Sequence, residues 1–214
     1  MARTKLKRLQ KIYELKNVFN IKDPNISEKL KNYFYPNKTF TLEIGCGHGD
    51  YSVQLAQRFP GRNFIGVDVK GARIYKGAIK SLELELNNVA FVLAKAEKLN
   101  EVFQTKSIEE IYIPFPEPHV KRANENRRLI SPDFIKLYKE LLMDSGLIHF
   151  KTDNSMFYEY VIQNISKFDG KILHCTEDLY NDDSSTINSG IISTFEQYYI
   201  NKGVKIKYIC SSFN

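Results

Sequence analysis

The chain has 214 residues, of which 43% are hydrophobic and 26% are charged, and its formal net charge is +6. This length fits one α/β domain with short additions and makes a two-domain organisation unnecessary. No apolar run that could form a signal peptide or membrane span follows the basic N-terminal residues, so we expect a cytoplasmic protein without membrane association. Cys46, Cys175 and Cys210 lack the spacing of a disulfide framework or a zinc site, and we expect no bound metal.

The first 37 residues are predicted to precede the main domain as a basic arm and a helical lead-in. Residues 1–19 are rich in Lys and Arg and are expected to be partly helical, and residues 20–37 form a short segment punctuated by Pro24 and Pro36. The arm is suited to contact phosphates, and disorder is an equally good interpretation. The domain itself is predicted to span residues 38–214.

From residue 39 onward, the hydrophobic pattern predicts strands and helices in alternation. Strands are expected at 39–44, 63–69, 89–94, 110–115, 147–151 and 171–175, and helices at 50–58, 71–85, 131–145 and 155–168, with a helical connection around 97–104. The last twenty residues are predicted to hold a hairpin. This order implies an α/β, Rossmann-like fold with a mostly parallel sheet, helices on both faces and a C-terminal antiparallel hairpin. Ligands of such folds bind at the carboxyl ends of the strands.

A glycine-rich turn, EIGCGHG at residues 43–49, is predicted between the first strand and the first helix. Its third glycine comes one residue too early for a dinucleotide-binding fingerprint. The E-x-G-x-G-x-G form resembles the turn with which class I methyltransferases cradle the amino-acid part of S-adenosylmethionine. In that resemblance Gly45, Gly47 and Gly49 allow close backbone approach, and Glu43 attracts the ammonium group of the cofactor.

Asp68 ends the second predicted strand, nineteen residues after Gly49. A carboxylate at this place can accept hydrogen bonds from both ribose hydroxyls of a nucleoside. The alternative is that Asp68 only caps the turn that follows it.

The most specific pattern follows the strand at 110–115. The stretch PFPEPHVKR at 114–122, continued by NENRRL at 124–129, resembles the F-x-D-P-W-x-K-K-R-H-x-K-R-R-L segment of bacterial tRNA (guanine-N7)-methyltransferases. Three further blocks agree with that family: EIGCGHG at 43–49, IHFKTDN at 148–154, and STFEQ with NKG at 193–203. Together they run from about residue 40 to the C terminus.

The resemblance implies S-adenosylmethionine as the cofactor and assigns residues to it. The family's contacts fall on Glu43, Gly45, Gly47, Gly49, Asp68, Lys95 and Glu117. Two of these depart from the family pattern: Lys95 stands where the family has an Asp, with Glu97 nearby, and Glu117 replaces the family's catalytic Asp. The Trp next to that Asp is replaced by His119.

The resemblance further implies tRNA as the partner and N7 of a guanosine, in the variable loop, as the methylated atom. Glu117 and Asp153 take the catalytic positions. Substrate contacts fall on Lys121, Arg122, Arg127, Arg128, Asp153, Ser193 and Glu196. Charge alone does not distinguish this basic run from a solvated face. A monomer or weak homodimer is expected.

Two other functions are compatible with these residues. A small-molecule methyltransferase would share the cofactor half of the site, but it gives no reason for the basic run at 121–128. A catalytically weak RNA-binding protein that keeps the fold is suggested by the departures at Lys95, Glu117 and His119.

Overall fold

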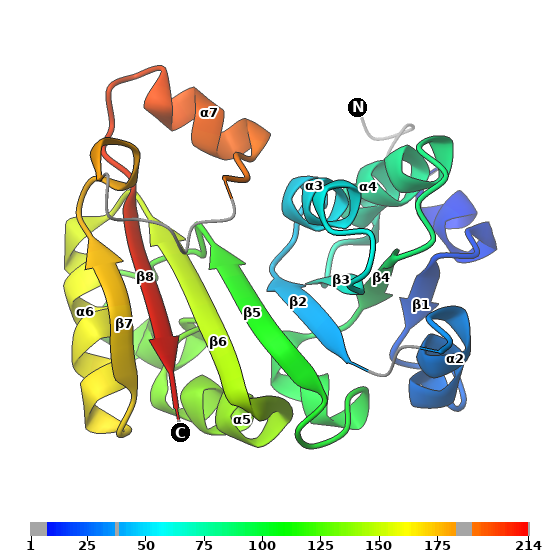
Figure 1. Ribbon diagram of the computed structural model, residues 1–214, viewed down its shortest axis with the longest axis horizontal. Helices are drawn as coiled ribbons and strands as arrows, with labels where there is room; N and C mark the ends of the chain where they lie inside the picture. Colours follow the sequence, from blue (N-terminus) through cyan, green and yellow to red (C-terminus); the bar gives the residue numbers. More distant parts are fainter. Residues whose placement is uncertain (1–7, 37–38, 183–189, 214) are drawn as a thin grey trace.

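The computed structural model describes residues 8–36, 39–182 and 190–213, with the backbone alone described at residue 122. These residues form one eight-stranded sheet in the order β1-β4-β3-β2-β5-β6-β8-β7 (Figure 1). The strands are β1 (Val18–Asn20), β2 (Phe40–Ile44), β3 (Phe64–Asp68), β4 (Val89–Leu93), β5 (Ile108–Pro114), β6 (Leu142–Thr152), β7 (Lys171–Thr176) and β8 (Lys207–Ser212). The α-helices are α2 (Ile26–Tyr33), α3 (Asp50–Arg58), α4 (Gly71–Glu83), α5 (Pro132–Leu141), α6 (Ser155–Lys167) and α7 (Thr194–Ile200). Short 3-10 helices are η1 (Ile12–Glu14), η2 (Ala96–Glu101), η3 (Arg122–Arg127) and η4 (Leu179–Asn181).

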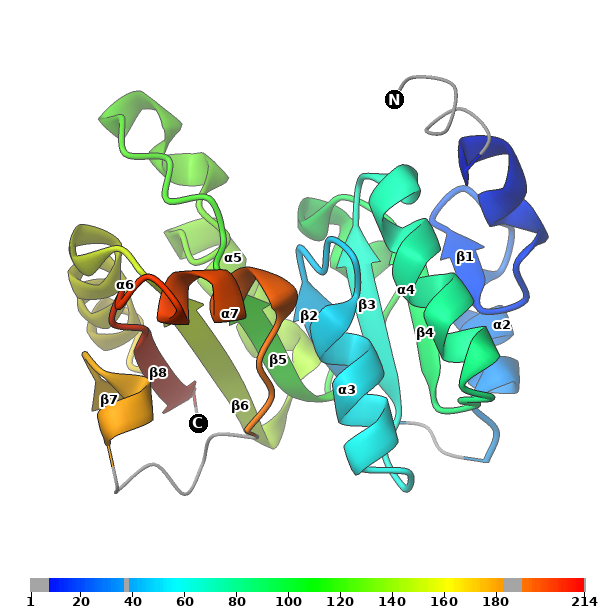
Figure 2. The same ribbon diagram turned by 90° about the horizontal axis from the view of Figure 1, so that it is seen from above.

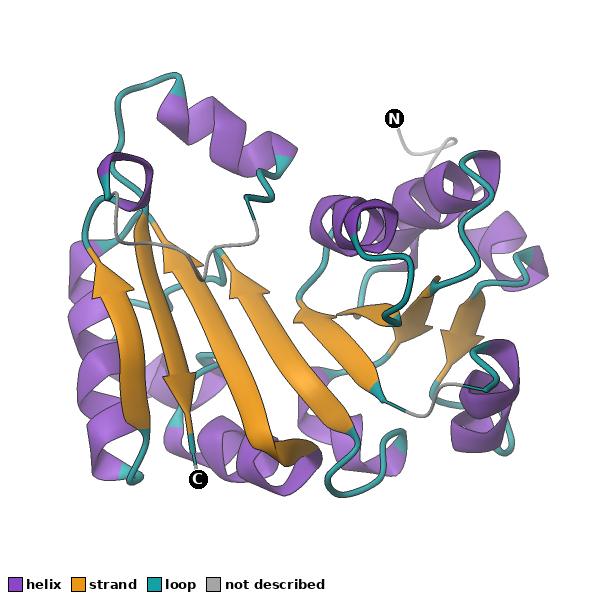
Figure 3. Ribbon diagram, in the orientation of Figure 1, coloured by secondary structure: helices purple, strands orange, loops and turns teal. Residues whose placement is uncertain are grey.

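Helices cover both faces of the sheet, as the alternating pattern predicted (Figures 2 and 3). Neighbouring residues of β3 show this: Phe64 belongs to the buried cluster that contains residues of α3 and α4, and Ile65 belongs to the cluster that contains residues of α5 and α6. A strand buried on both faces reads as a continuous apolar run, which is typical of parallel sheets.

The C-terminal antiparallel pair is confirmed, but it is not a hairpin. β8 lies between β6 and β7 and runs antiparallel to both. The chain between β7 and β8 carries η4 and α7, so the two strands are distant in sequence. The prediction of a hairpin within the last twenty residues is therefore wrong, because a helical pattern and one strand share that segment.

The segment before residue 37 is built into the domain. β1 pairs in parallel with β4 at the edge of the sheet, and α2 buries Ile26 and Leu30 in the core. The Asn17 side chain donates hydrogen bonds to Ala78 O at 3.0 Å and to Ser81 Oγ at 2.8 Å. Residues 1–7 of the expected arm lie outside the described residues.

The predicted fifth strand begins earlier than expected. The helix predicted to run up to Gly146 ends at Leu141, and β6 begins at Leu142 with a register irregularity against β5. Among the helices of the described ranges, none combines the length and apolar character that crossing a bilayer requires.

The order of the strands places a ligand site between β2 and β5. The chain runs from β2 outward to β3 on one side, and β5 adds on the other side. At such a switch point the loops after the two strands diverge and leave a crevice at their carboxyl ends. The glycine turn follows β2, and the loop at residues 115–121 follows β5.

Candidate active site

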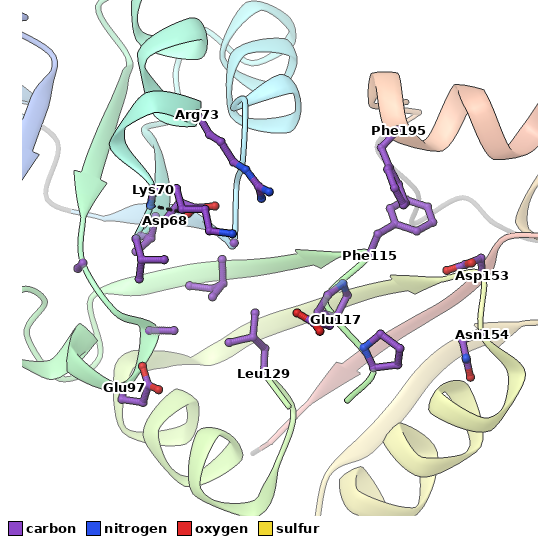
Figure 4. Close-up of a pocket in the computed structure, with 18 of the residues that line it drawn as sticks. Asp68, Lys70, Arg73, Glu97, Phe115, Glu117, Leu129, Asp153, Asn154 and Phe195 are labelled. Atoms are coloured by element: carbon purple, nitrogen blue, oxygen red, sulfur yellow. Dashed lines mark hydrogen bonds between the residues drawn. The ribbon is translucent and has the colours of Figure 1, made fainter. Parts of the chain in front are cut away.

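Two adjoining cavities lie at the carboxyl ends of β2, β3 and β5. The β3-side cavity has a volume of about 530 Å³, and its lining includes Asp68, Glu117 and Asp153 (Figure 4). The glycine-loop cavity has a volume of about 640 Å³ and is lined by the turn after β2 and the start of α7. Residues that line both are Gly45, Arg73, Phe115 and Phe195. Both volumes are typical of small-molecule sites, roughly 300–1,000 Å³.

The turn between β2 and α3 requires glycine at three positions. Gly45, Gly47 and Gly49 have φ values of 75°, 56° and 73°, a region that residues with a Cβ rarely adopt. Gly45 and Gly47 line the glycine-loop cavity, where a ligand can reach them. Gly49 lines neither cavity, because it is buried, and a Cβ there would lie 2.4 Å from the ring of Phe91. The expected cofactor contact of Gly49 is therefore replaced by a packing role.

Asp68 is nearly buried, 9% exposed, at the end of β3 in the β3-side cavity. Its Oδ2 accepts the N–H of Gly47 at 2.9 Å, and its Oδ1 accepts the N–H of Lys70 at 2.8 Å. The turn-capping alternative is thus realised in the structure. It does not exclude a ribose contact, since each carboxylate oxygen has two lone pairs.

Glu43 lies at the end of β2 and lines the glycine-loop cavity, yet it is only 4% exposed. Ser52 lies in the first turn of α3. Glu43 Oε2 accepts hydrogen bonds from the Ser52 N–H at 2.8 Å and from the Ser52 hydroxyl at 2.6 Å. Burial raises the pKa of Glu43 to about 8. Because a nearby cation favours the ionised form, an ammonium bound in this cavity would draw Glu43 toward the carboxylate.

The ends of β5 and β6 carry two carboxylates. Glu117 lies on the loop after β5, with 79% of its side chain exposed, and Asp153 directly follows β6. Figure 4 shows both on the side of the β3-side cavity opposite Asp68. The nearest basic nitrogen recorded for Glu117 is His119 Nδ1, 3.8 Å from its Oε1.

The loop after β5 has an unusual backbone. Phe115 and His119 have φ values of 51° and 41°, which costs on the order of 1–3 kcal/mol each and is typical of functional sites. The N–H of Phe115 donates to the carbonyl of Lys151 at 2.9 Å. This bond ties the start of the loop to β6, so that Glu117 and Asp153 share one edge.

Comparison with known proteins identifies the family. Residues 36–209 match the model of a family described as putative methyltransferase. A tRNA (guanine-N(7)-)-methyltransferase of Christiangramia forsetii is 34% identical, with 97% of each chain covered. A second, from Cytophaga hutchinsonii, is 35% identical over 100% of this chain and 99% of its own. The chain belongs to the tRNA (guanine-N(7)-)-methyltransferase family.

A solved structure shows the same fold. The crystal structure of a SAM-dependent methyltransferase from Aquifex aeolicus has a TM-score of 0.58 at 12% identity, with 96% of this chain and 98% of that chain covered. The family resemblance and the α/β fold are therefore confirmed, and the cavities can be compared with S-adenosylmethionine, the cofactor that the resemblance implies. The cavities fit it, because Asp68 suits a ribose and the glycine turn lies beside it. The described residues contain no cluster of His, Cys, Asp and Glu that would hold a metal ion.

Lys95 does not take the place expected for it. It is an exposed residue that precedes η2 and does not line the β3-side cavity, whereas its neighbours Ala94, Ala96 and Glu97 do. Glu97 is the carboxylate that the structure places there.

The basic residues after β5 are of two kinds. Lys121 and Arg127 are exposed, on a segment that projects beyond the sheet on the side of α5 and α6 (Figure 2). Arg128 is 12% exposed and donates to the carbonyls of Pro118 at 3.0 Å and His119 at 3.2 Å. The guanidinium of Arg128 also lies 4.1 Å from the centre of a neighbouring aromatic ring, in a cation–π contact. Arg128 therefore supports the loop at residues 115–121 through its hydrogen bonds, and its guanidinium is less accessible than the side chains of Lys121 and Arg127.

The side chain of Arg122 lies outside the described residues.

Glu196, for which a substrate contact was expected, is buried, and its carboxylate contacts other side chains of the protein. Its Oε1 lies 2.8 Å from Lys151 Nζ, and the two side chains are 0% and 4% exposed. The hydroxyls of Tyr180 and Tyr51 also donate to Glu196, at 2.6 Å and 3.4 Å. We call Lys151, Glu196, Tyr51 and Tyr180 the α7 clasp, since they join α7 to β6 and α3.

Ser193 lies at the N-terminus of α7 and lines the glycine-loop cavity. Its hydroxyl accepts the N–H of Glu196 at 3.1 Å, and Glu196 Oε2 accepts the N–H of Ser193 at 3.3 Å, which is a capping box. The S-x-x-E pattern is thus explained first by helix capping. The clasp and the cap together place Ser193 and Phe195 at the cavities.

Three residues of the site were not singled out from the sequence. Phe195 and Arg73 line both cavities, and Lys151 holds the clasp. Lys151 did give a signal, because a lysine within the apolar strand IHFK requires a buried partner. Arg73 gave none, since basic residues are common on helices.

Proposed function

We propose that this protein transfers the methyl group of S-adenosylmethionine to N7 of a guanosine in tRNA, within the variable loop. The observation that carries the proposal is the juxtaposition of the cofactor residues at β2 and β3 with two carboxylates at the ends of β5 and β6. The names of the relatives support tRNA as the substrate. The exposed basic residues that follow β5, on the same loop region as Glu117, support a phosphate-bearing partner.

The chemistry requires little from the protein beyond alignment. When bound, the cofactor supplies a methyl group activated by a positively charged sulfonium. Guanine N7 carries a lone pair and no proton, so no general base is needed. Transfer of this methyl group to N7 would leave the positive charge on the base. In this proposal, Glu117 accepts hydrogen bonds from the N1 and N2 edge of guanine and offsets this charge, and Asp153 orients the base.

The proposal is tested by incubating the purified protein with labelled S-adenosylmethionine and an unmodified tRNA transcript, followed by nucleoside analysis. The expected product is 7-methylguanosine, lost when the guanosines of the variable loop are replaced by adenosine. Methylation of metabolites without RNA would instead indicate a small-molecule enzyme. RNA binding without measurable cofactor affinity would indicate the catalytically weak RNA-binding alternative.

Asp68→Ala is expected to weaken S-adenosylmethionine binding by about 1 to 3 kcal/mol, because it leaves hydrogen-bonding groups without partners. Two of these are the N–H groups of Gly47 and Lys70, so part of the loss reflects a loosened glycine turn. Asp68→Asn keeps one acceptor oxygen and should lose less. Isothermal titration calorimetry without tRNA measures the affinity of each variant for S-adenosylmethionine. Equal affinity of the unaltered protein and the two variants would exclude the ribose contact.

Lys121→Ala is expected to weaken tRNA binding. It should also reduce the slope of log affinity against log salt by about one, which corresponds to one fewer phosphate contact. Lys121 is exposed at the catalytic edge, and its loss leaves the cofactor cavities unchanged. Lys29→Ala, an exposed lysine on α2 at the far end of the sheet, is the charge-matched control and should leave the slope unchanged. If both variants behave alike, the loop is a solvated face.

A further inference from the structure

Arg73 occupies the junction of the two cavities. It lies in the first turn of α4 and lines both the β3-side cavity, with Asp68, and the glycine-loop cavity, with Gly47. Figure 4 shows its side chain extending from α4 into the β3-side cavity. Within the described ranges, Arg73 is in no ion pair and donates no hydrogen bond. A guanidinium that lines a cavity in this way is available to a ligand.

Four of the amide groups of the glycine turn are already engaged. The N–H groups of Gly45 and Cys46 both donate to the carbonyl of Val67, at 2.8 Å and 3.0 Å. The N–H of Gly49 donates to Cys46 O at 2.8 Å, and that of Gly47 donates to Asp68. These four donors hold the turn together, so they are not free to bind an anion.

The cavities otherwise carry an excess of acidic side chains. Acidic residues that line one or the other are Glu43, Asp50, Asp68, Glu97, Glu117 and Asp153. In the described chain, the lysine and arginine side chains that line them are Lys70, in the β3-side cavity alone, and Arg73, in both. Such a site suits an ammonium and a sulfonium but repels a carboxylate. S-adenosylmethionine carries all three groups.

The charge of Arg73 acts at the glycine turn. The pKa of His48 is lowered, first by its burial and then by the positive charges of Lys76 and, to a smaller extent, Arg73. If Asp68 binds the ribose of the cofactor, the amino-acid end of the cofactor extends toward the glycine-loop cavity. Arg73 is the cation that lies at the passage between these two ends.

We propose that Arg73 binds the carboxylate of S-adenosylmethionine. This assignment rests on the proposed function and extends it from the cofactor to one of its groups. An arginine presents two parallel N–H donors that match a carboxylate. The contact would let the enzyme distinguish S-adenosylmethionine from analogues that lack the carboxylate.

The test compares two ligands by calorimetry without tRNA: S-adenosylmethionine and decarboxylated S-adenosylmethionine, which differ only in the carboxylate. Arg73→Ala and Arg73→Gln are expected to weaken binding of the first by about tenfold or more and to leave binding of the second within about twofold. Arg73→Lys should fall in between, because it keeps the charge and loses the planar fork. Lys76→Ala removes the same charge one turn along α4, outside both cavities, and should weaken neither ligand.

Equal weakening of both ligands by Arg73→Ala would overturn the assignment, because the effect would not depend on the carboxylate. Unchanged affinity for both would also overturn it, and a reduced salt slope for tRNA in the same variant would reassign Arg73 to a phosphate. If the unaltered protein bound neither ligand, the proposed function itself would fail. Arg73 is exposed, so all variants should keep the melting temperature of the parent protein.

Discussion

Glu196→Gln is expected to lower the free energy of unfolding by about 3 to 5 kcal/mol, because it removes one partner of a buried ion pair and leaves the other charged. The remaining charge would be the ammonium of Lys151, which is 4% exposed. Its pKa is already lowered, chiefly by burial, and Glu196 is what opposes that effect. Urea denaturation followed by circular dichroism measures the change.

The control is an ion pair of equal length on the surface. Lys106 Nζ lies 2.8 Å from Asp144 Oδ1, but both side chains are largely exposed, so Asp144→Asn should have no measurable effect on stability. Lys151→Met combined with Glu196→Gln should cost less than the sum of the single changes, since the two residues share one interaction. A loss below about 1 kcal/mol for Glu196→Gln would contradict the clasp as a stabilising feature.

The core of the fold could be predicted from the sequence because its signals are local. The helix expected at 50–58 is observed as α3 with the same bounds, since a glycine turn starts it and an apolar face continues it. The strand expected at 63–69 is observed as β3 within one residue at each end. Apolar periodicity and glycine positions are properties of short segments.

The C-terminal part could not be predicted in this way, because its pairing is non-local. β8 inserts between β6 and β7, and no local pattern specifies which strands it joins. The same holds for β1, whose three residues pair with β4 more than seventy positions later. A three-residue strand leaves too short a pattern to separate it from a loop.

Sequence motifs predicted which segments form the candidate site, but the structure gives several single side chains in those segments a different setting from the one expected. The family pattern indicated the glycine turn, Asp68 and the two strand ends, and the structure places these segments at the two cavities. The pattern does not reveal which matched residues point into the protein. Arg128 is partly buried and Glu196 is fully buried, and both make supporting contacts within the protein. Burial depends on what packs above a residue, and here that is α7 or the loop after β5.

Glu117→Gln is expected to reduce the rate of methyl transfer by about 10²-fold, the effect typical of losing one electrostatic contact to a transition state. Glutamine is nearly isosteric, but it cannot offset the positive charge that forms on guanine, and its amide presents donors where guanine also presents donors. Glu117→Asp keeps the charge on a shorter stem, as in the family pattern, and should be partly tolerated.

Both Glu117 variants should keep the fold and the affinity for S-adenosylmethionine, because 79% of the Glu117 side chain is exposed and little packs against it. Single-turnover rates at saturating enzyme on one unmodified tRNA separate the chemical step from binding. The control is Glu28→Gln, an exposed acidic residue of α2 that lines neither cavity. Full activity of Glu117→Gln would remove Glu117 from the mechanism. Asp153, at the end of the neighbouring strand, would then be the carboxylate to test, because it lines the same cavity and is less exposed than Glu117.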